Sequence, residues 1–203
     1  MILSISGRIG NGKDTIADII QTMTPYYRWE VKKFAGKLKD VAEMLSGVPK
    51  VRFEDQDFKQ RDMGPEWGMT YREFLQKIGT EAMRNGLHEN VWVNALFSEY
   101  QANTIAIGTS EFDITEEDQL PYWIITDTRF PNELQAVKER NGITIKVVRN
   151  TTNTIGATHA SETALDDYTE WDYVVDNNGS IEDLKIQVMA ILSTEDLLKF
   201  AGL

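Results

Sequence analysis

A glycine-rich loop near the N-terminus restricts the folds open to this chain: Gly7-Arg8-Ile9-Gly10-Asn11-Gly12-Lys13-Asp14-Thr15. It matches the phosphate-binding loop (P-loop) pattern G-x-x-x-x-G-K, in which backbone N–H groups surround a phosphate and the lysine reaches the β- and γ-phosphates. An apolar run, residues 1–6, precedes the loop, and apolar residues at helical spacing follow it. A strand, this loop and a helix in that order predict a nucleotide-phosphate site. The alternative is a plain glycine-rich turn.

Asp14 departs from the general pattern, because most such loops carry Ser or Thr at this position, and here Thr15 follows one residue later. A carboxylate could bind Mg²⁺ directly or through water, since magnesium prefers oxygen ligands and keeps several waters. Thr15 could then serve an α-phosphate oxygen. Alternatively, Asp14 only complements the positive N-terminus of the following helix. The sequence leaves both roles open.

Composition excludes several classes of protein. With 203 residues and 41% hydrophobic content, we expect one domain over residues 1–203. The balance of 21 basic and 32 acidic residues gives a net charge of −11, which argues against nucleic-acid or membrane partners. An anionic nucleotide must therefore meet locally placed Lys and Arg. No signal sequence or long apolar run opens the chain, so we expect a cytoplasmic protein, as a monomer or homodimer.

Strand and helix patterns alternate along the chain, which predicts an α/β fold with a parallel sheet and ligands at the C-terminal ends of its strands. Residues 48–70 are predicted as an irregular insertion and residues 104–121 as an exposed acidic excursion. The predicted strands cover residues 1–6, 27–35, 122–126, 143–148 and 171–175. The predicted helices cover residues 13–23, 37–46 (ending at Gly47), 71–86, 90–102, 131–140 and a C-terminal region from about 181.

A second candidate site follows the apolar run Ile124-Ile125-Thr126, where the chain continues Asp127-Thr128-Arg129. An acidic residue after such a strand is typical of the second Mg²⁺-side group of a P-loop protein. Arg129 can neutralise phosphoryl oxygens, and no adjacent Glu is placed to activate water, which favours phosphoryl transfer over hydrolysis. The alternative makes Asp127 a helix-capping turn residue and Arg129 part of a surface salt bridge.

The predicted helix 71–86 divides into two faces when it is wound at α-helical spacing. Its polar edge carries residues four apart, namely Arg72, Gln76, Thr80 and Arg84. Its apolar face carries Phe74, Leu75, Ile78, Ala82 and Met83. Gly79 costs about 1 kcal/mol relative to Ala in mid-helix, which indicates close approach of another group. A substrate-binding role for the polar edge and an ordinary solvated face are both compatible with this pattern.

Several blocks occur in a fixed order behind the P-loop. They are Phe34-Ala35-Gly36-Lys37-Leu38-Lys39, Gln76-Lys77-Ile78-Gly79-Thr80-Glu81-x-x-Arg84, Val91-Trp92-Val93, Asp127 to Glu133, and His159-Ala160-Ser161-Glu162. In this combination the chain resembles the deoxynucleoside monophosphate kinases of tailed phages, within the P-loop nucleotide kinases. That family usually has the Gly-Lys-Asp-Thr form of the loop, so Asp14 departs from the general motif but not from the family's.

The resemblance implies a three-layer P-loop NTPase fold with a five-stranded parallel core (residues 1–47 and 122–203), a helical monophosphate-binding insertion (about 48–104) and a short lid (about 150–165). ATP would occupy the P-loop with Mg²⁺ held by Asp14 and Asp127, while Lys13, Asp127 and Arg129 would serve catalysis. Other ATP-side residues would be Gly7, Arg8, Gly10, Asn11, Gly12, Thr15, Arg149, Asn177 and Gly179. The residues expected to bind the monophosphate are Lys37, Lys39, Gln76, Thr80, Glu81 and Arg84. Arg72 is added to them because it lies on the same predicted helix edge as Gln76, Thr80 and Arg84.

The expected reaction is ATP + dNMP → ADP + dNDP, in the host cytoplasm if the chain comes from a phage. The acceptor phosphate is anionic near neutral pH, so it needs no general base. The lid stretch contains no arginine, unlike many nucleotide-kinase lids, and His159 could be only structural. The rival hypotheses are a kinase for another phosphorylated metabolite, such as phosphomevalonate or a pantetheine nucleotide, and a catalytically silent nucleotide-binding module. A GTPase switch is disfavoured because we find no N/T-K-x-D motif.

Overall fold

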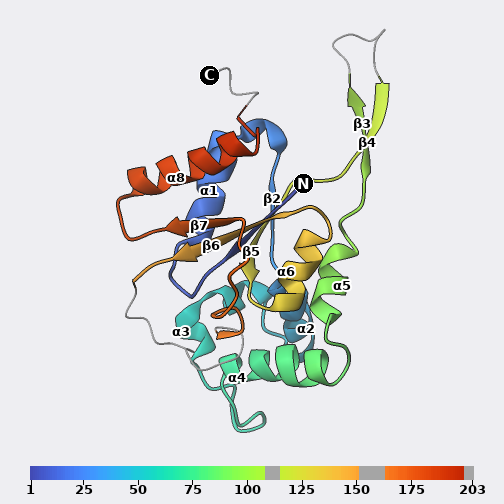
Figure 1. The fold of residues 1–203 in the computed structure, drawn as a ribbon. Coiled ribbons are helices and arrows are strands. Elements are labelled where there is room, and N and C mark those ends of the chain that lie inside the picture. The colour runs from blue at the N-terminus through green and yellow to red at the C-terminus, as the bar shows by residue number, and fades with distance from the viewer. Residues whose placement is uncertain (108–114, 151–162, 199–203) are drawn as a thin grey trace. The chain divides into compact units, whose positions relative to one another are not determined.

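The computed structural model describes residues 1–107, 115–150 and 163–198, which form two compact units. Unit 1 comprises Met1–Lys33 and Tyr100–Leu203, and unit 2 comprises Phe34–Glu99. Unit 1 contains a five-stranded sheet in the order β2-β5-β1-β6-β7, in which every neighbouring pair is parallel (Figure 1). The predicted α/β fold of a P-loop kinase with a five-stranded parallel core is confirmed.

The elements of unit 1 follow the predicted alternation, with differences at their ends. Its strands and helices are β1 (Ile2–Ser6), α1 (Lys13–Met23), η1 (Pro25–Tyr27), β2 (Glu30–Lys32), β3 (Asn103–Ile107), β4 (Thr115–Gln119), β5 (Trp123–Thr128), α6 (Pro131–Lys138), β6 (Ile143–Val148), β7 (Tyr173–Asp176) and α8 (Ile181–Thr194). The prediction for β6 has the observed bounds. Edge strand β2 is much shorter than predicted, because Tyr27 belongs to η1 and Ala35 already begins the next helix.

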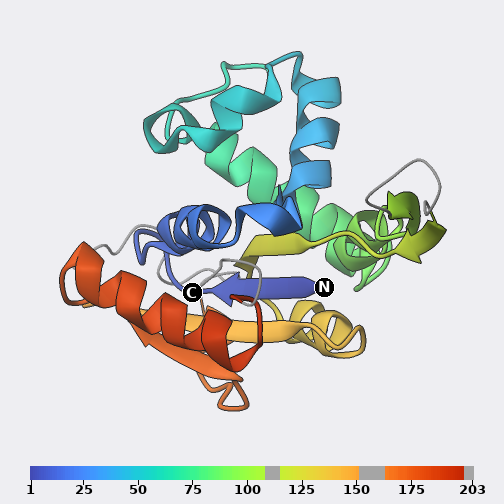
Figure 2. The same ribbon diagram turned by 90° about the horizontal axis from the view of Figure 1, so that it is seen from above.

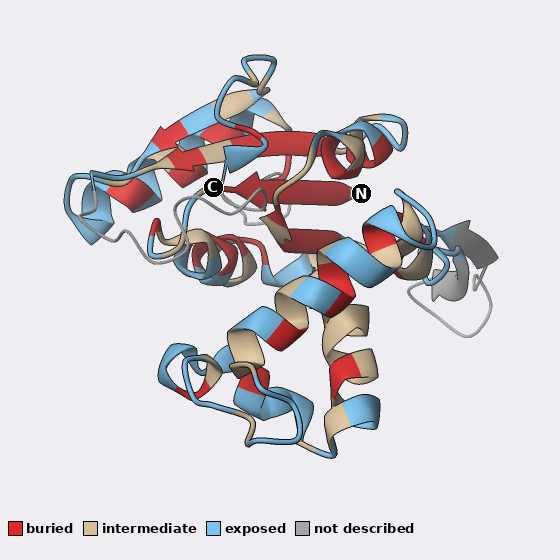
Figure 3. Ribbon diagram, turned by 90° about the horizontal axis from the view of Figure 1, so that it is seen from below, coloured by how far each residue is buried: buried red, intermediate tan, exposed pale blue. Residues whose placement is uncertain are grey.

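Strand β1 occupies the middle of the sheet, between β5 and β6 (Figure 2). All five of its residues are buried, which is why its sequence is an apolar run without polar alternation. Helices α1 and α8 pack on one face, where Ile16 and Leu184 share a core cluster with Leu3 and Ile5. Helix α6 packs against β1 and β6. Figure 3 shows the central strands β1 and β5 almost entirely buried, as expected for the middle of a sheet covered on both faces.

The acidic segment 104–121 was predicted as a turn-rich excursion, and in this respect the prediction is wrong. Strands β3 and β4 pair antiparallel, with Asn103 opposite Gln119 and Ile107 opposite Thr115. The ladder is stabilised by pairing between two separate segments, and local composition does not report such pairing. The acidic residues of β4 therefore favoured a loop in the sequence-based prediction.

Unit 2 is helical and begins at Phe34, so the helix over residues 35–46, which we expected in the core, lies in this unit. Its elements are α2 (Ala35–Ser46), η2 (Lys50–Glu54), α3 (Gln56–Lys59), α4 (Tyr71–Gln76), the π-helix η3 (Lys77–Asn85) and α5 (Val91–Phe97). Its buried core joins residues from these helices, namely Ala42, Phe53, Phe58, Phe74 and Ile78. Gly47 ends α2 in the left-handed conformation with φ 69°, as predicted.

The predicted helix 71–86 changes its winding halfway. Residues 71–76 are α-helical, whereas Lys77–Asn85 form a π-helix, in which hydrogen bonds join residues five apart. The α-helical wheel therefore fails in the second half. Arg84, expected on the polar edge, is 9% exposed, and Ala82, expected on the apolar face, is exposed. The wider turn rotates each successive side chain away from its α-helical position.

Two further expectations concern the lid and membranes. Most of the predicted lid, residues 151–162, and with it His159, lies outside the described residues. Among the helices of the described ranges, none has the length and apolarity needed to cross a membrane.

Candidate functional site

The P-loop of unit 1 connects β1 to α1 through two glycines with positive φ, Gly10 at 83° and Gly12 at 94°. At Gly12 a Cβ atom would lie 2.4 Å from Asn177 Nδ2, so a side chain is excluded by space as well as by the backbone conformation. Asn177 Nδ2 donates to the Asn11 carbonyl oxygen at 2.8 Å. Asn11 in turn donates from Nδ2 to the Val147 carbonyl oxygen at 2.8 Å. These bonds fix the loop to β6 and to the segment that follows β7.

Lys13 is the first residue of α1, and its ammonium turns back over the loop. Its Nζ donates to the carbonyl oxygens of Gly7 at 2.7 Å and Arg8 at 3.0 Å. Burial lowers the pKa of Lys13 to about 8, the nearby Arg129 adds to the decrease, and Asp14 and Asp127 oppose it. The structure thus brings the predicted catalytic groups of the P-loop and of β5 into one electrostatic neighbourhood.

Arg129 follows β5 at the start of α6, where a buried carboxylate holds its backbone. Glu133, 3% exposed, accepts from the backbone N–H groups of Arg129 at 2.8 Å and Phe130 at 3.1 Å. A glutamate near the start of a helix satisfies N–H groups that the helix itself leaves without partners. Beneath this turn, the buried hydroxyls of Thr128 and Ser4 are hydrogen-bonded at 2.7 Å, which joins the end of β5 to the middle of β1. The position of Arg129 is therefore fixed relative to the P-loop.

A cavity of about 290 Å³ lies in unit 1 at the C-terminal ends of β1, β5 and β6. Parallel sheets commonly bind ligands at this edge. Its lining comprises Ser6, Gly7, Arg8, Asn11, Thr128, Arg129, Lys146, Val147, Val148, Arg149, Asn150, Leu165, Asp166 and Trp171. Three arginines and a lysine face one aspartate in this lining, although the chain as a whole is acidic. The cavity therefore suits an anion such as a phosphate group.

Asp14 and Thr15 occupy the first turn of α1, and both are exposed. The side chain of Asp14 is 73% exposed, and its Oδ1 lies 3.5 Å from Lys33 Nζ. An exposed carboxylate beside the P-loop lysine suits magnesium, which binds one or two protein carboxylates together with phosphate oxygens and water. Within the described residues no group of three or more His, Cys, Asp and Glu gathers as a metal centre, so a metal here would depend on the nucleotide for its remaining ligands.

The remaining predicted ATP-side residues lie around the same loop. Arg149 donates from Nη1 to the Gly10 carbonyl oxygen at 3.4 Å, at the edge of the hydrogen-bond range. Gly179 lies next to the N-cap of α8, and a Cβ there would approach Asp183 Oδ2 to 2.7 Å. Arg8 forms an ion pair with Asp166 at 2.8 Å. Whether Asn177 and Gly179 contact adenine stays a prediction.

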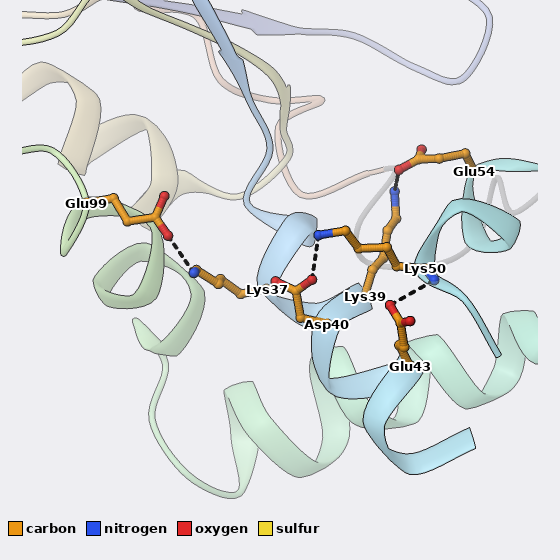
Figure 4. A network of polar contacts seen from close by, with 7 residues as sticks. All are labelled: Lys37, Lys39, Asp40, Glu43, Lys50, Glu54 and Glu99. Carbon is orange, nitrogen blue, oxygen red and sulfur yellow. Dashed lines mark hydrogen bonds and ion pairs between the residues drawn. The ribbon is translucent and has the colours of Figure 1, made fainter. Parts of the chain in front are cut away.

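The predicted acceptor residues lie in unit 2, and the structure does not bring all of them together. Lys37 and Lys39 are two apart on α2 and therefore point to different sides of the helix (Figure 4). Lys37 pairs with Glu99 and Lys39 with Glu54, each at 2.5 Å. The hydrogen bond to Glu99 raises the pKa of Lys37. One bound phosphate is thus more readily reached by one of these lysines than by both.

The other acceptor candidates follow α4 and η3. Arg72 donates to Gln56 Oε1 at 2.9 Å, and Glu81 is exposed with its carboxylate 3.7 Å from Lys77 Nζ. Gln76 and Thr80 are partly exposed. Arg84 is largely buried and donates to the Glu89 carbonyl oxygen at 3.3 Å. Arg72, Gln76 and Thr80 remain accessible candidates, whereas Arg84 is embedded near the end of the π-helix.

Sequence reasoning missed several residues at these sites. It assigned no role to Glu133, although its position near the start of a predicted helix is a capping signal. It also missed Lys146, Trp171 and Asp166 in the cavity, because β6 and the segment before β7 meet only through the sheet. The close approach predicted at Gly79 is present, since Trp92 Nε1 donates to its carbonyl oxygen at 2.9 Å and a Cβ would lie 3.0 Å from Leu38 Cδ2.

Comparison with known proteins identifies the family. The family model described as deoxynucleotide monophosphate kinase matches residues 56–188. A protein of Acanthamoeba polyphaga mimivirus, provisionally named deoxynucleotide monophosphate kinase, is 26% identical over 198 residues, covering 94% of this chain and 95% of that protein. The deoxynucleotide monophosphate kinase of Escherichia phage RB69 is 31% identical over 121 residues, or 60% of this chain and 44% of the phage protein. The chain belongs to the deoxynucleotide monophosphate kinase family, whose members are phosphotransferases.

Proposed function

We propose that the chain transfers the γ-phosphoryl group of ATP to a deoxynucleoside monophosphate, giving ADP and the diphosphate. The proposal rests mainly on one observation: the Lys13 ammonium lies over the carbonyl oxygens of the P-loop, and Glu133 holds the backbone of Arg129 at the end of the neighbouring strand β5. Cations at both the P-loop and the end of β5, next to a cation-lined cavity, are what a transferring phosphoryl group requires. The family membership supports the same chemistry.

On the donor side, Lys13 exchanges its bonds to the Gly7 and Arg8 carbonyl oxygens for phosphate oxygens. An anion there also opposes the desolvation that depresses the pKa of this ammonium, so bound nucleotide favours its charged form. Arg129 neutralises charge on the transferred group from a backbone position held by Glu133. Mg²⁺, held by Asp14 and Asp127 with the nucleotide, supplies further charge neutralisation when bound.

On the acceptor side, cationic and amide side chains of unit 2 bind the monophosphate. Lys39, Arg72, Gln76 and Thr80 are the residues we assign, and Arg84 supports them from its buried position. Because the acceptor phosphate is already anionic near neutral pH, no residue has to remove a proton from it. Catalysis then depends on alignment and on neutralisation of charge.

A panel of nucleoside and deoxynucleoside monophosphates, assayed with ATP and Mg²⁺ for ADP formation, tests this proposal. We expect ADP and the matching diphosphate with at least one deoxynucleotide. Activity with another phosphorylated metabolite alone, such as phosphomevalonate or a pantetheine nucleotide, would assign a different acceptor to the same fold. Binding of ATP without ADP formation for any acceptor would show a silent nucleotide-binding module, and the proposal would be wrong.

A further inference from the structure

The ion pair between Lys39 and Glu54 covers one of the assigned acceptor cations. The side chain of Lys39, on α2, is only 12% exposed, and its Nζ lies 2.5 Å from Oε1 of Glu54. The side chain of Glu54 is 53% exposed. The carboxylate is therefore the outer member of the pair, and the ammonium has little other contact with solvent. Figure 4 shows Glu54 facing the end of the Lys39 side chain.

The backbone around Glu54 is held on both sides, so the carboxylate is supported from a fixed position. Phe53, the preceding residue, is fully buried in the core of unit 2. Asp55, the following residue, caps α3 by accepting from the backbone N–H groups of Asp57 at 2.9 Å and Phe58 at 3.1 Å. These two anchors place Glu54 at the end of η2, next to α2.

Two other ion pairs on α2 differ from this one in exposure. Lys37 and Glu99 are 42% and 40% exposed, so an anion can approach Lys37 without displacing its partner. Lys50 and Asp40 are 60% and 45% exposed, and neither belongs to the assigned acceptor residues. Among these three pairs, only the cation of Lys39 is both largely buried and covered by its carboxylate. A phosphate that binds Lys39 has to displace Glu54.

We propose that Glu54 is a specificity-determining residue for the acceptor, because its carboxylate occupies Lys39 until a doubly charged phosphate group replaces it. The inference rests on the proposed function, in which Lys39 binds the acceptor phosphate. A phosphate monoester carries a charge of about −1.5 to −2 at pH 7 and three acceptor oxygens, so it competes successfully with a single carboxylate. Singly charged anions, such as free carboxylates, gain nothing by the exchange.

The substitution Glu54→Gln tests this inference by removing the competing charge while keeping the side-chain shape. At saturating ATP, we expect KM for the accepted deoxynucleotide to fall about two- to fivefold, the range that ion pairs with exposed partners typically contribute, with kcat unchanged. Acetate, a singly charged anion, should inhibit this variant at lower concentrations than it inhibits the wild type. Asp40→Asn is the matched control, since it makes the same charge change in unit 2, at a residue of α2 whose ion pair with Lys50 is exposed, and its KM should stay at the wild-type value.

A double-mutant cycle separates direct competition from a general charge effect. In a Lys39→Met background, Glu54→Gln should leave KM unchanged, because the cation that it frees is absent. An unchanged or raised KM in Glu54→Gln, or a fall equal to that of Asp40→Asn, overturns this inference and leaves the kinase proposal intact. If calorimetry detects no deoxynucleotide binding to the wild type, and no ADP forms, the proposed function fails and the inference fails with it.

Discussion

The partly buried ammonium of Lys13 destabilises the nucleotide-free protein in a way that depends on pH. Burial and Arg129 lower its pKa from 10.5 to about 8. A pKa difference of one corresponds to about 1.4 kcal/mol, so this decrease corresponds to about 3 kcal/mol. Because Lys13 is only partly buried by surface area, solvent screening reduces the expected free energy to about 1–3 kcal/mol.

The sign follows from proton binding. Between pH 8 and 10.5, the unfolded chain keeps the Lys13 proton while the folded protein has lost it, so the free energy of unfolding rises with pH. The variant Lys13→Met keeps the length of the side chain but lacks this titration. We therefore expect the unfolding free energy of the wild type, minus that of the variant, to increase by about 1–3 kcal/mol between pH 7 and 10.

Urea unfolding followed by tryptophan fluorescence, without nucleotide, at pH 7, 8, 9 and 10 measures this difference. Lys50→Met is the control: the hydrogen bond with Asp40 raises the pKa of Lys50 above 10.5, so its contribution is constant below that pH and the difference stays flat. A flat difference for Lys13→Met as well would refute the reasoning, because it would show that the Lys13 ammonium is not desolvated in the folded protein.

Two further substitutions test local features of the two units. Gly12→Ala should destabilise the protein by about 1–3 kcal/mol and abolish ADP binding in calorimetry, because its Cβ would meet Asn177 Nδ2 at 2.4 Å in a left-handed backbone conformation. Gly47→Ala, at φ 69° with open space around it, has only the dihedral cost of about 1–2 kcal/mol and should bind ADP normally; equal loss of binding in both variants contradicts the argument. Trp92→Phe leaves the buried Gly79 carbonyl without its indole donor and should lower the unfolding free energy by about 1–3 kcal/mol in urea. Trp67→Phe, at an exposed position, should change it by less than about 0.5 kcal/mol, and similar losses in both would show that the indole bond is not the cause.

The sequence predicted the central part of the fold because local pattern and tertiary environment agree there. The apolar run of β1 is buried on both faces, most residues of β6 are buried, and the glycines of the P-loop have the positive φ angles that the motif requires. The π-helix could not be predicted, since helical-wheel arguments assume α-helical winding. The pairing of β3 with β4 was missed because the acidic composition of β4 favours a loop, and composition does not report strand pairing.

The candidate site divides in the same way. Asp127 and Arg129 come close to Lys13 because β1 and β5 are parallel neighbours, so that the P-loop after β1 and the residues at the end of β5 meet at one edge of the sheet. The sequence could predict this proximity, because both segments follow apolar strand patterns. The burial of Arg84 depends on the π-helical winding. The ion pair in which Glu54 shields Lys39 from solvent depends on how η2 packs against α2. Both are tertiary features that spacing along the sequence does not report.

Phosphoryl transfer by the wild type and by two single variants tests the central claim most directly. ADP and the deoxynucleoside diphosphate are measured together, with ATP, Mg²⁺ and the best acceptor of the panel. We expect one diphosphate per ADP in the wild type and a decrease in kcat of at least about 100-fold in both Lys13→Ala and Arg129→Ala, with folding preserved by circular dichroism. Retained turnover in both variants would contradict the account.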